Sequence, residues 1–254
     1  LADVVWVIRN FRPDIIVCRF PTTGEGGHGH HTASAILAEE AFAAAADPAK
    51  FPEQLSENVS VWQAKRILWN TFNFGSTNTQ KEDQFKMDVG GFNPLLGKSY
   101  GEIAALSRSQ HKSQGFGVPA QRGKTLEYFA TIKGDKPMND LMDGVVTGWS
   151  RVGLPVIEAQ IDSILNEFNP IQPVSSVKKL VRLYNTIEQS NDFYWKKQKL
   201  KELKELIANC SGLYMEAVSA SHYVVLGDSM KLNINLINRL GAGISSAFVK
   251  INNN

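Results

Sequence analysis

Along the first third of the chain, short apolar runs alternate with patterns of helical period. Apolar side chains from Val4 to Phe11 recur at helical spacing over residues 2–11, and Arg12-Pro13 ends that pattern. The run DIIVCRF at 14–20 follows and is nearly continuous in apolar residues. Such a run is typical of a strand that is buried on both faces in a parallel sheet.

A polar loop over 21–31 follows this strand, and a helical pattern begins near Thr32 and ends at Ala46. KRILWNTFNF at 65–74 then indicates a second strand. Helix, buried strand, loop, helix and strand is the order of a layered α/β fold, and we expect a partial Rossmann-like domain of this class. In such sheets the loops beyond the carboxyl ends of the strands carry the ligand site.

Residues 75–98 are polar and rich in glycine, which suits a loop over that site. A helix is predicted over 99–114 and an alternating strand over 125–132. We therefore place the first domain at residues 1–133.

The pattern changes after Gly134. Three apolar patterns with i, i+3, i+4 spacing lie between 153 and 211, so we expect a helical segment at 134–212. From Leu213 onward, period-2 alternation broken by glycines is typical of strands, the last of them in SSAFVKI. Residues 213–254 are therefore expected to begin a β-sandwich.

The composition narrows the classes of partner that we expect for this chain. Of 254 residues, 27 are Lys or Arg and 25 are Asp or Glu, and the net charge of +2 gives no electrostatic footprint for nucleic acid. No apolar run approaches the roughly 20 residues that a membrane-spanning helix needs. Cys18 and Cys210 lie far apart in apolar patterns, so we expect two buried small side chains rather than a disulfide.

Three of the five histidines, His28, His30 and His31, lie within four positions, between a glycine-rich loop and the alanine-rich helix. Histidines in such a loop are usually solvated turn residues. However, the loop's glycines let the backbone approach a ligand closely, and a neutral imidazole is a common zinc ligand. The strand before the loop and the helix after it favour a site, and the pattern alone leaves both interpretations open.

The metallo-β-lactamase signature H-x-H-x-D-H is rejected, because the chain has Thr32 and Ala33 where Asp and His are required. The segment GGHGHHTASAILAEEAFAAAADP instead resembles the second motif block, usually G-H-P-D-H, of the PIG-L/LmbE family of zinc-dependent N-acetyl-sugar deacetylases. SRSQHKSQGFG at 107–117 is similar to that family's H-x-[ST]-Q motif. The resemblance covers about residues 1–132. Within it, the stretch GKSYGEIAALSRSQHKSQG is similar to the sequences of the family's large multidomain bacterial members.

The resemblance implies a role for each histidine of the cluster. His31 corresponds to a zinc ligand, and His28 to the imidazolium that stabilises the tetrahedral oxyanion or protonates the departing amine. His30 falls where the family usually has an Asp that orients the neighbouring histidine, and Gly29 replaces the usual Pro. The expected catalytic residues are therefore His28 and His30, and the expected metal ligand is His31.

Other residues are candidates for contact with the substrate. His111 and Gln114 would line the pocket by resemblance, or else cap the C-terminus of their helix. Arg19, beside the loop, would contact a sugar hydroxyl or a phosphate, or else form a surface ion pair. Scattered tryptophans such as Trp69 would stack on sugar rings or belong to the core.

By resemblance, the expected activity is zinc-dependent hydrolysis of the acetamide of an N-acetylated amino sugar or related glycoconjugate. The alternative is a non-catalytic carbohydrate-binding or scaffolding member of the same fold. The family's H-P-D-D-E motif, which supplies the other zinc ligands and the general base, is nowhere in these residues. We therefore expect an inactive fragment of a longer enzyme, and the resemblance implies a periplasmic or extracellular location.

Overall fold

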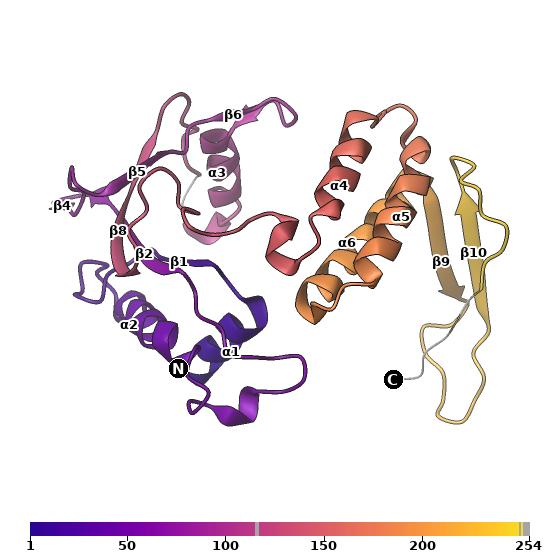
Figure 1. The fold of residues 1–254 in the computed structure, drawn as a ribbon, viewed down its shortest axis with the longest axis horizontal. Coiled ribbons are helices and arrows are strands. Elements are labelled where there is room, and N and C mark those ends of the chain that lie inside the picture. Colours follow the sequence, from indigo (N-terminus) through magenta and orange to yellow (C-terminus); the bar gives the residue numbers. More distant parts are fainter. Residues whose placement is uncertain (115–116, 249, 251–254) are drawn as a thin grey trace. The chain divides into compact units, whose positions relative to one another are not determined.

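The structure is a computed structural model that describes residues 1–114, 117–248 and 250 (Figure 1). Contacts divide the chain into two compact units, Leu1–Val145 and Val146–Asn254. Within the described ranges, no helix is both long enough and apolar enough to cross a membrane.

The first unit combines helices with a mixed sheet, which confirms the expected α/β class in this general form. The sheet has the strand order β1-β2-β8-β5. Strands β1 and β2 are parallel, and β8 runs antiparallel to both of its neighbours. The elements of the unit, in chain order, are α1 (Ala2–Phe11), β1 (Ile15–Cys18), α2 (Gly29–Ala44), η1 (Pro52–Gln54), β2 (Arg66–Thr71), β3 (Asn73–Phe74), β4 (Thr77–Asn78), β5 (Phe85–Asp88), β6 (Phe92–Asn93), β7 (Lys98–Ser99), α3 (Tyr100–Arg108), η2 (Lys112–Gln114) and β8 (Leu126–Gly134).

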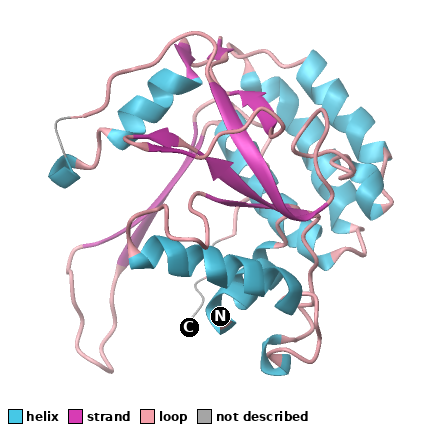
Figure 2. Cartoon of the chain, turned by 90° about the vertical axis from the view of Figure 1, so that its left-hand side faces the viewer, coloured by secondary structure: helices cyan, strands magenta, loops and turns pink. Residues whose placement is uncertain are grey.

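Helices α1 and α2 lie together on one side of this sheet (Figures 1 and 2). Their shared core consists of small and branched side chains, and Ile16 of β1 packs against it. Alanines on α2 let the two helices approach closely because they add little bulk. A second cluster, formed by Leu68, Phe85 and Phe129, joins β2, β5 and β8. The buried members of the α1–α2 core are Val5, Ile8, Ala41, Ala44 and Ala45.

A buried arginine ties α1 to the end of α2. The Arg9 side chain is fully buried, and its guanidinium donates to the carbonyl oxygens of Ala44, Ala45 and Asp47 at 2.8–3.2 Å. It also donates to the carbonyl oxygen of Lys50 at 2.7 Å. The last carbonyls of a helix have no partner within the helix. Arg9 supplies donors there, and its positive charge suits the negative end of the α2 dipole.

Several sequence-based expectations for this unit are wrong in detail. Strand β1 is an edge strand and is not buried on both faces, since Val17 is 48% exposed. Residues 75–98 are not simply a loop, because β5 lies within them and joins the main sheet. The helix predicted over 99–114 ends at Arg108. Its start is well defined, because Ser99 and Glu102 form a reciprocal capping box.

The second unit contains η3 (Trp149–Val152), α4 (Val156–Asn166), η4 (Pro173–Ser176), α5 (Val177–Glu188), α6 (Phe193–Ser211), β9 (Leu213–Ser219) and β10 (Leu232–Asn238). The three helical patterns are confirmed. Helix α5 packs against both α4 and α6, and Ile157, Leu180, Leu183, Ile187 and Leu203 form the buried core. Gly212 ends α6 in a left-handed conformation (φ 62°) that favours glycine.

After α6 the chain forms an antiparallel hairpin, in which Leu213 of β9 pairs with Asn238 of β10. Two of the strands expected from the alternating pattern are therefore present. The third is not seen at residues 245–248, and Val249 and Ile251 of SSAFVKI lie outside the described residues. The two cysteines are free, as expected, but both are half-buried rather than buried. Burial, with a smaller contribution from Glu39, raises the pKa of the Cys18 thiol.

Candidate functional site

The histidine cluster lies where the parallel strands end. Strands β1 and β2 run in the same direction, so Cys18 and Thr71 end them at the same edge of the sheet. The glycine-rich loop leaves from that edge and enters α2, whose N-cap is His28. Helix α2 begins at Gly29, three residues earlier than the pattern predicted. His31 therefore lies in the first turn of α2, at its positive end.

The His31 ring is fixed from two directions. Its Nδ1 lies 3.0 Å from the carbonyl oxygen of Gly26, and its ring stacks on Phe20 with the centroids 3.8 Å apart. A carbonyl oxygen only accepts, so this contact assigns the proton to Nδ1. In the neutral ring the lone pair then lies on Nε2. A histidine that binds a metal usually donates its other ring N–H in this way.

His28 lies beside His31, whereas His30 does not. The ring centroids of His28 and His31 are 5.1 Å apart and the rings meet edge to face. The side chain of His28 is exposed and that of His31 half-buried. The ring of His30 is also exposed and has no interaction within the described part of the chain; only its carbonyl is used, by the Ser34 hydroxyl at 2.7 Å.

The expected substrate-binding residues are placed differently. Arg19 donates to the Oδ1 atom of Asn70 and lies 3.9 Å from Glu127, and its guanidinium carbon is 5.9 Å from the centroid of the Phe72 ring. It thus forms the surface ion pair considered as an alternative, and a substrate role stays a prediction.

The H-x-[ST]-Q segment does not lie on a regular helix as expected. His111 is exposed and follows α3, and its backbone N–H donates to the carbonyl of Arg108 at 3.2 Å. Gln114 ends η2, and its side chain lies outside what the structure describes. No interaction among the described residues joins His111 to the histidines at the start of α2.

A cavity that the sequence did not predict is lined by β2, β8 and the neighbouring loops. Glu25 of the glycine-rich loop is one of its lining residues. This β2–β8 cavity has a volume of about 500 Å³. Trp69 of β2 and Phe129, Ala130 and Thr131 of β8 line it from the sheet. The remaining lining residues come from the loops and from β4, namely Glu25, Asn78, Thr79, Lys81, Asp83, Gln84 and Lys136.

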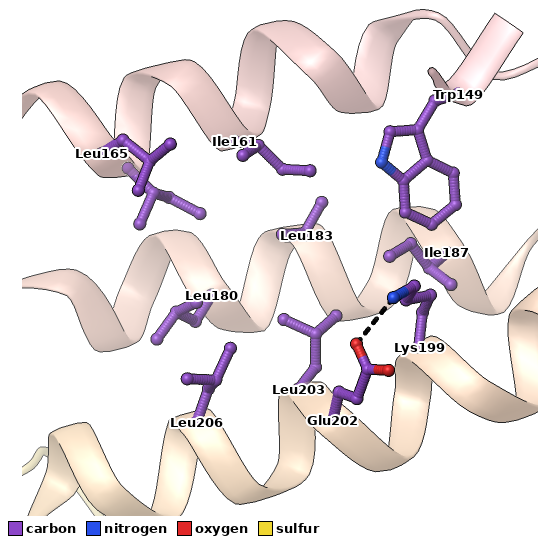
Figure 3. Close-up of a pocket in the computed structure, with 11 residues that line it drawn as sticks. Trp149, Ile161, Leu165, Leu180, Leu183, Ile187, Lys199, Glu202, Leu203 and Leu206 are labelled. Atoms are coloured by element: carbon purple, nitrogen blue, oxygen red, sulfur yellow. Dashed lines mark hydrogen bonds and ion pairs between the residues drawn. The ribbon is translucent and has the colours of Figure 1, made fainter. Parts of the chain in front are cut away.

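The second unit has a different kind of hollow. The α4–α6 groove, of about 270 Å³, has Leu180, Leu183 and Ile187 of α5 at its base (Figure 3). Isoleucines and a leucine of α4 and leucines of α6 line its sides. Its charged residues, Lys199 and Glu202, bond to each other at 2.8 Å. The groove is therefore apolar and offers no nucleophile or set of metal ligands.

Within the described ranges, no group of three or more His, Cys, Asp or Glu side chains is arranged to hold a metal ion. Comparisons with protein-family models, with curated proteins and with solved structures match nothing.

Proposed function

We propose that the first unit is part of a zinc-dependent hydrolase that removes the acetyl group from an N-acetylated amino sugar or a related glycoconjugate. The observation that carries the proposal is the contact between His31 Nδ1 and the Gly26 carbonyl. It leaves Nε2 with its lone pair at the first turn of α2. The same residues carry the resemblance to the G-H-P-D-H block of the PIG-L/LmbE deacetylases.

His31 fits a zinc ligand by its tautomer and by the partner of its other ring nitrogen. The described residues provide no complete ligand set, so the proposal requires further ligands and a general base from polypeptide outside these 254 residues. When bound, zinc supplies an activated water and polarises the acetamide carbonyl. His31 would bind the zinc ion from a fixed direction, because the contacts with Phe20 and Gly26 fix the orientation of its ring.

Of the described residues, His28 is placed to stabilise the negative charge that develops on the carbonyl oxygen in the transition state. Its ring lies 5.1 Å from the His31 ring, so a carbonyl held near His31 Nε2 is within reach of it. In its protonated form, His28 donates a hydrogen bond to the oxyanion of the tetrahedral intermediate and then a proton to the leaving amine. One such donor is typically worth about 2.7–4 kcal/mol in the transition state.

The second candidate is a carbohydrate-binding or scaffolding protein without turnover. The position of His30 favours it. In the family block this position usually holds an Asp that orients a histidine, whereas the His30 ring makes no contact with His28 or His31 in the described structure. The geometry of His31 favours the enzyme, because a fixed imidazole with a free Nε2 is not needed for sugar binding.

The test is made on the product of the complete reading frame that contains these residues. We expect one zinc ion per chain and release of acetate from N-acetylglucosamine derivatives. His31→Ala should abolish both, and His28→Ala should abolish acetate release while zinc is retained. Ser34→Ala, on the same helix, serves as the control. Full zinc loading without acetate release from several such substrates would overturn the enzyme and leave the binding protein.

A further inference from the structure

The α4–α6 groove has the shape of a binding site for a helix. Helix α5 packs against both α4 and α6, and side chains of these two outer helices point toward each other across α5 (Figure 3). The layer of three helices therefore leaves an open position over α5, where the fourth helix of a bundle would lie. Grooves of this kind bind amphipathic helices through apolar side chains at positions i, i+3, i+4 and i+7.

Both sides of the groove expose a leucine that the core of the unit does not bury. Leu165 of α4 is 67% exposed and Leu206 of α6 is 48% exposed, although both line the groove. Between them, Leu183 of α5 is buried and belongs to the core. The three helices are therefore packed without the two outer leucines, whose apolar surface is available to a partner. Burial of such surface is the main favourable contribution to association.

The rim of the groove on α4 carries negative charge. Glu158 and Asp162 precede Leu165 by seven and three residues, spacings that place the three side chains on one side of the helix. The Glu158 carboxylate accepts from the backbone N–H of Trp149 at 2.8 Å, and Trp149 lines the groove. Both carboxylates are exposed, and α4 contains no Lys or Arg. This rim therefore favours a cationic partner.

The rim on α6 carries negative charge as well. Glu202 lines the groove and is paired with Lys199 at 2.8 Å. Glu205 follows three residues later, is exposed and forms no ion pair within the described part of the chain. The Lys204 ammonium is directed elsewhere, because it lies 5.9 Å from the centroid of the Tyr184 ring, which does not line the groove.

The cations nearest to the groove do not balance these carboxylates. Lys199 and Arg151 both lie over the Trp195 ring, at 5.8 and 5.6 Å from its centroid. The four carboxylates of the two rims outnumber these two cations. The groove is therefore negative in a chain whose overall net charge is +2, so attraction of a cationic ligand to it does not follow from the charge of the whole chain.

We propose that the α4–α6 groove binds a cationic amphipathic helix of another protein. Apolar side chains of the partner cover Leu165 and Leu206, and its Lys or Arg side chains face the carboxylates of both rims. Complementary charge of this kind speeds the encounter and selects the partner, whereas the apolar contacts supply most of the affinity. The inference does not depend on the proposed function, because no residue of the first unit takes part.

The probe is a fluorescent peptide of two LKKLLKL repeats, which forms a cationic amphipathic helix, and its binding to the 254-residue chain is followed by fluorescence anisotropy. We expect saturable binding, weaker by about 10-fold or more for a peptide of two LEELLEL repeats, which has the same apolar face and the opposite charge. Leu206→Ala should weaken binding of the Lys peptide by roughly 5- to 30-fold, as for one apolar anchor. Leu226→Ala, at a fully exposed position outside the groove, is the matched control.

The charge of the rims is tested separately. The double variant Asp162→Lys and Glu205→Lys should lower the affinity for the Lys peptide by roughly 10-fold and raise that for the Glu peptide. Glu53→Lys with Glu57→Lys, at exposed positions of the first unit, changes the net charge equally and should leave both affinities nearly unchanged.

No saturable binding of the Lys peptide to the folded parent chain would overturn the inference, as would equal affinity in Leu206→Ala. Equal or tighter binding of the Glu peptide would overturn the assignment of a cationic partner. Sedimentation equilibrium of the parent chain alone tests the other occupant. A dimer that Leu206→Ala dissociates would place a second copy of this chain in the groove and overturn the proposal of another protein's helix.

Discussion

The imidazole ring of His31 lies flat against the phenyl ring of Phe20, with centroids 3.8 Å apart and an interplanar angle of 1°. Gly26 makes room for this pair. A Cβ atom added at Gly26 would lie 2.8 Å from Phe20 Cδ1 and 3.2 Å from His31 Cβ. The direction of the proposed zinc ligand therefore depends on the lack of a side chain five residues before it.

Gly26→Ala is expected to separate the two rings, because neither aromatic ring can yield at these distances without leaving the stack. The ring-current shift that Phe20 imposes on the His31 ring protons should fall, which NMR measures directly. Gly29→Ala is the matched control, since an added Cβ there meets no atom within 4 Å. It should keep the shift and stabilise α2 by up to about 1 kcal/mol. An unchanged ring-current shift in Gly26→Ala would contradict the expectation.

Replacing Arg9 should lower the free energy of unfolding more than replacing any exposed charged residue of this unit. Arg9→Met keeps much of the side-chain volume but leaves the carbonyl acceptors of Ala44, Asp47 and Lys50 without their donor. We expect a loss of about 3–5 kcal/mol in the free energy of unfolding, since several carbonyl oxygens lose their donor at once, at about 1–3 kcal/mol for each that is left buried and unpaired. Arg108→Met, at an exposed position, should change it by no more than about 0.5 kcal/mol. Urea unfolding measures both.

Helix α1 shows which features of a helix its hydrophobic pattern predicts and which it does not. The pattern located the helix correctly at residues 2–11, because helical period and the Arg-Pro stop are local signals. It placed Val5 and Ile8 correctly on the buried face, but it was wrong about two other positions. Phe11 is 69% exposed, whereas Arg9 is fully buried. A pattern treats arginine as solvent-facing. Only the carbonyls near the end of α2, some 35 residues later, explain why this one is inside.

The candidate site likewise has features that the sequence predicted and features that it did not. A glycine-rich loop followed by an alanine-rich run predicted a helix with His31 in its first turn; this is confirmed, although the helix begins at Gly29. The stack on Phe20 left no mark in the sequence, because it depends on how the loop folds back. The β2–β8 cavity was missed entirely, since its lining residues range from Glu25 to Lys136 and meet only after β8 has paired with β2.

Two leucines one turn apart on α6 test the core of the second unit. Leu203 is 5% exposed and packs on α5, whereas Leu206 is 48% exposed on the side of the α4–α6 groove. Leu203→Ala should lower the free energy of unfolding by roughly 2–5 kcal/mol, because it leaves a cavity between packed helices. Leu206→Ala should cost about 1 kcal/mol or less. Hydrogen exchange of the α6 amides measures the two losses, and equal costs would contradict the packing.

Asp143 makes the first unit sensitive to acid. Its carboxylate accepts from the backbone N–H groups of Asn139 and Met138, both at 2.7 Å, and these bonds hold its pKa below the usual value. The unfolded chain, with an ordinary Asp pKa of about 3.9, therefore binds the proton more tightly. The stabilisation is complete above that pKa and disappears as the pH falls through the folded-state pKa. Asp143→Asn cannot titrate, so its urea midpoint should fall less than that of the parent chain between about pH 5 and 2.

Zinc binding by the 254-residue chain alone should be weak. Of the described residues only His31 is proposed as a ligand, whereas catalytic zinc sites use three protein ligands and structural sites four. His31→Ala should therefore abolish what affinity remains, and His28→Ala should retain it. His30→Ala should leave it nearly unchanged, because that ring lies apart from the other two.

The measurement is competition with a chromophoric chelator at pH 7.5. The chelator should retain most of the zinc in the presence of the parent chain, and all of it in the presence of His31→Ala. Tight binding of one zinc ion that persists in His31→Ala would place the metal elsewhere in the chain. The lone pair on His31 Nε2 would then have no role as a ligand, and the deacetylase proposal would lose the contact on which it depends.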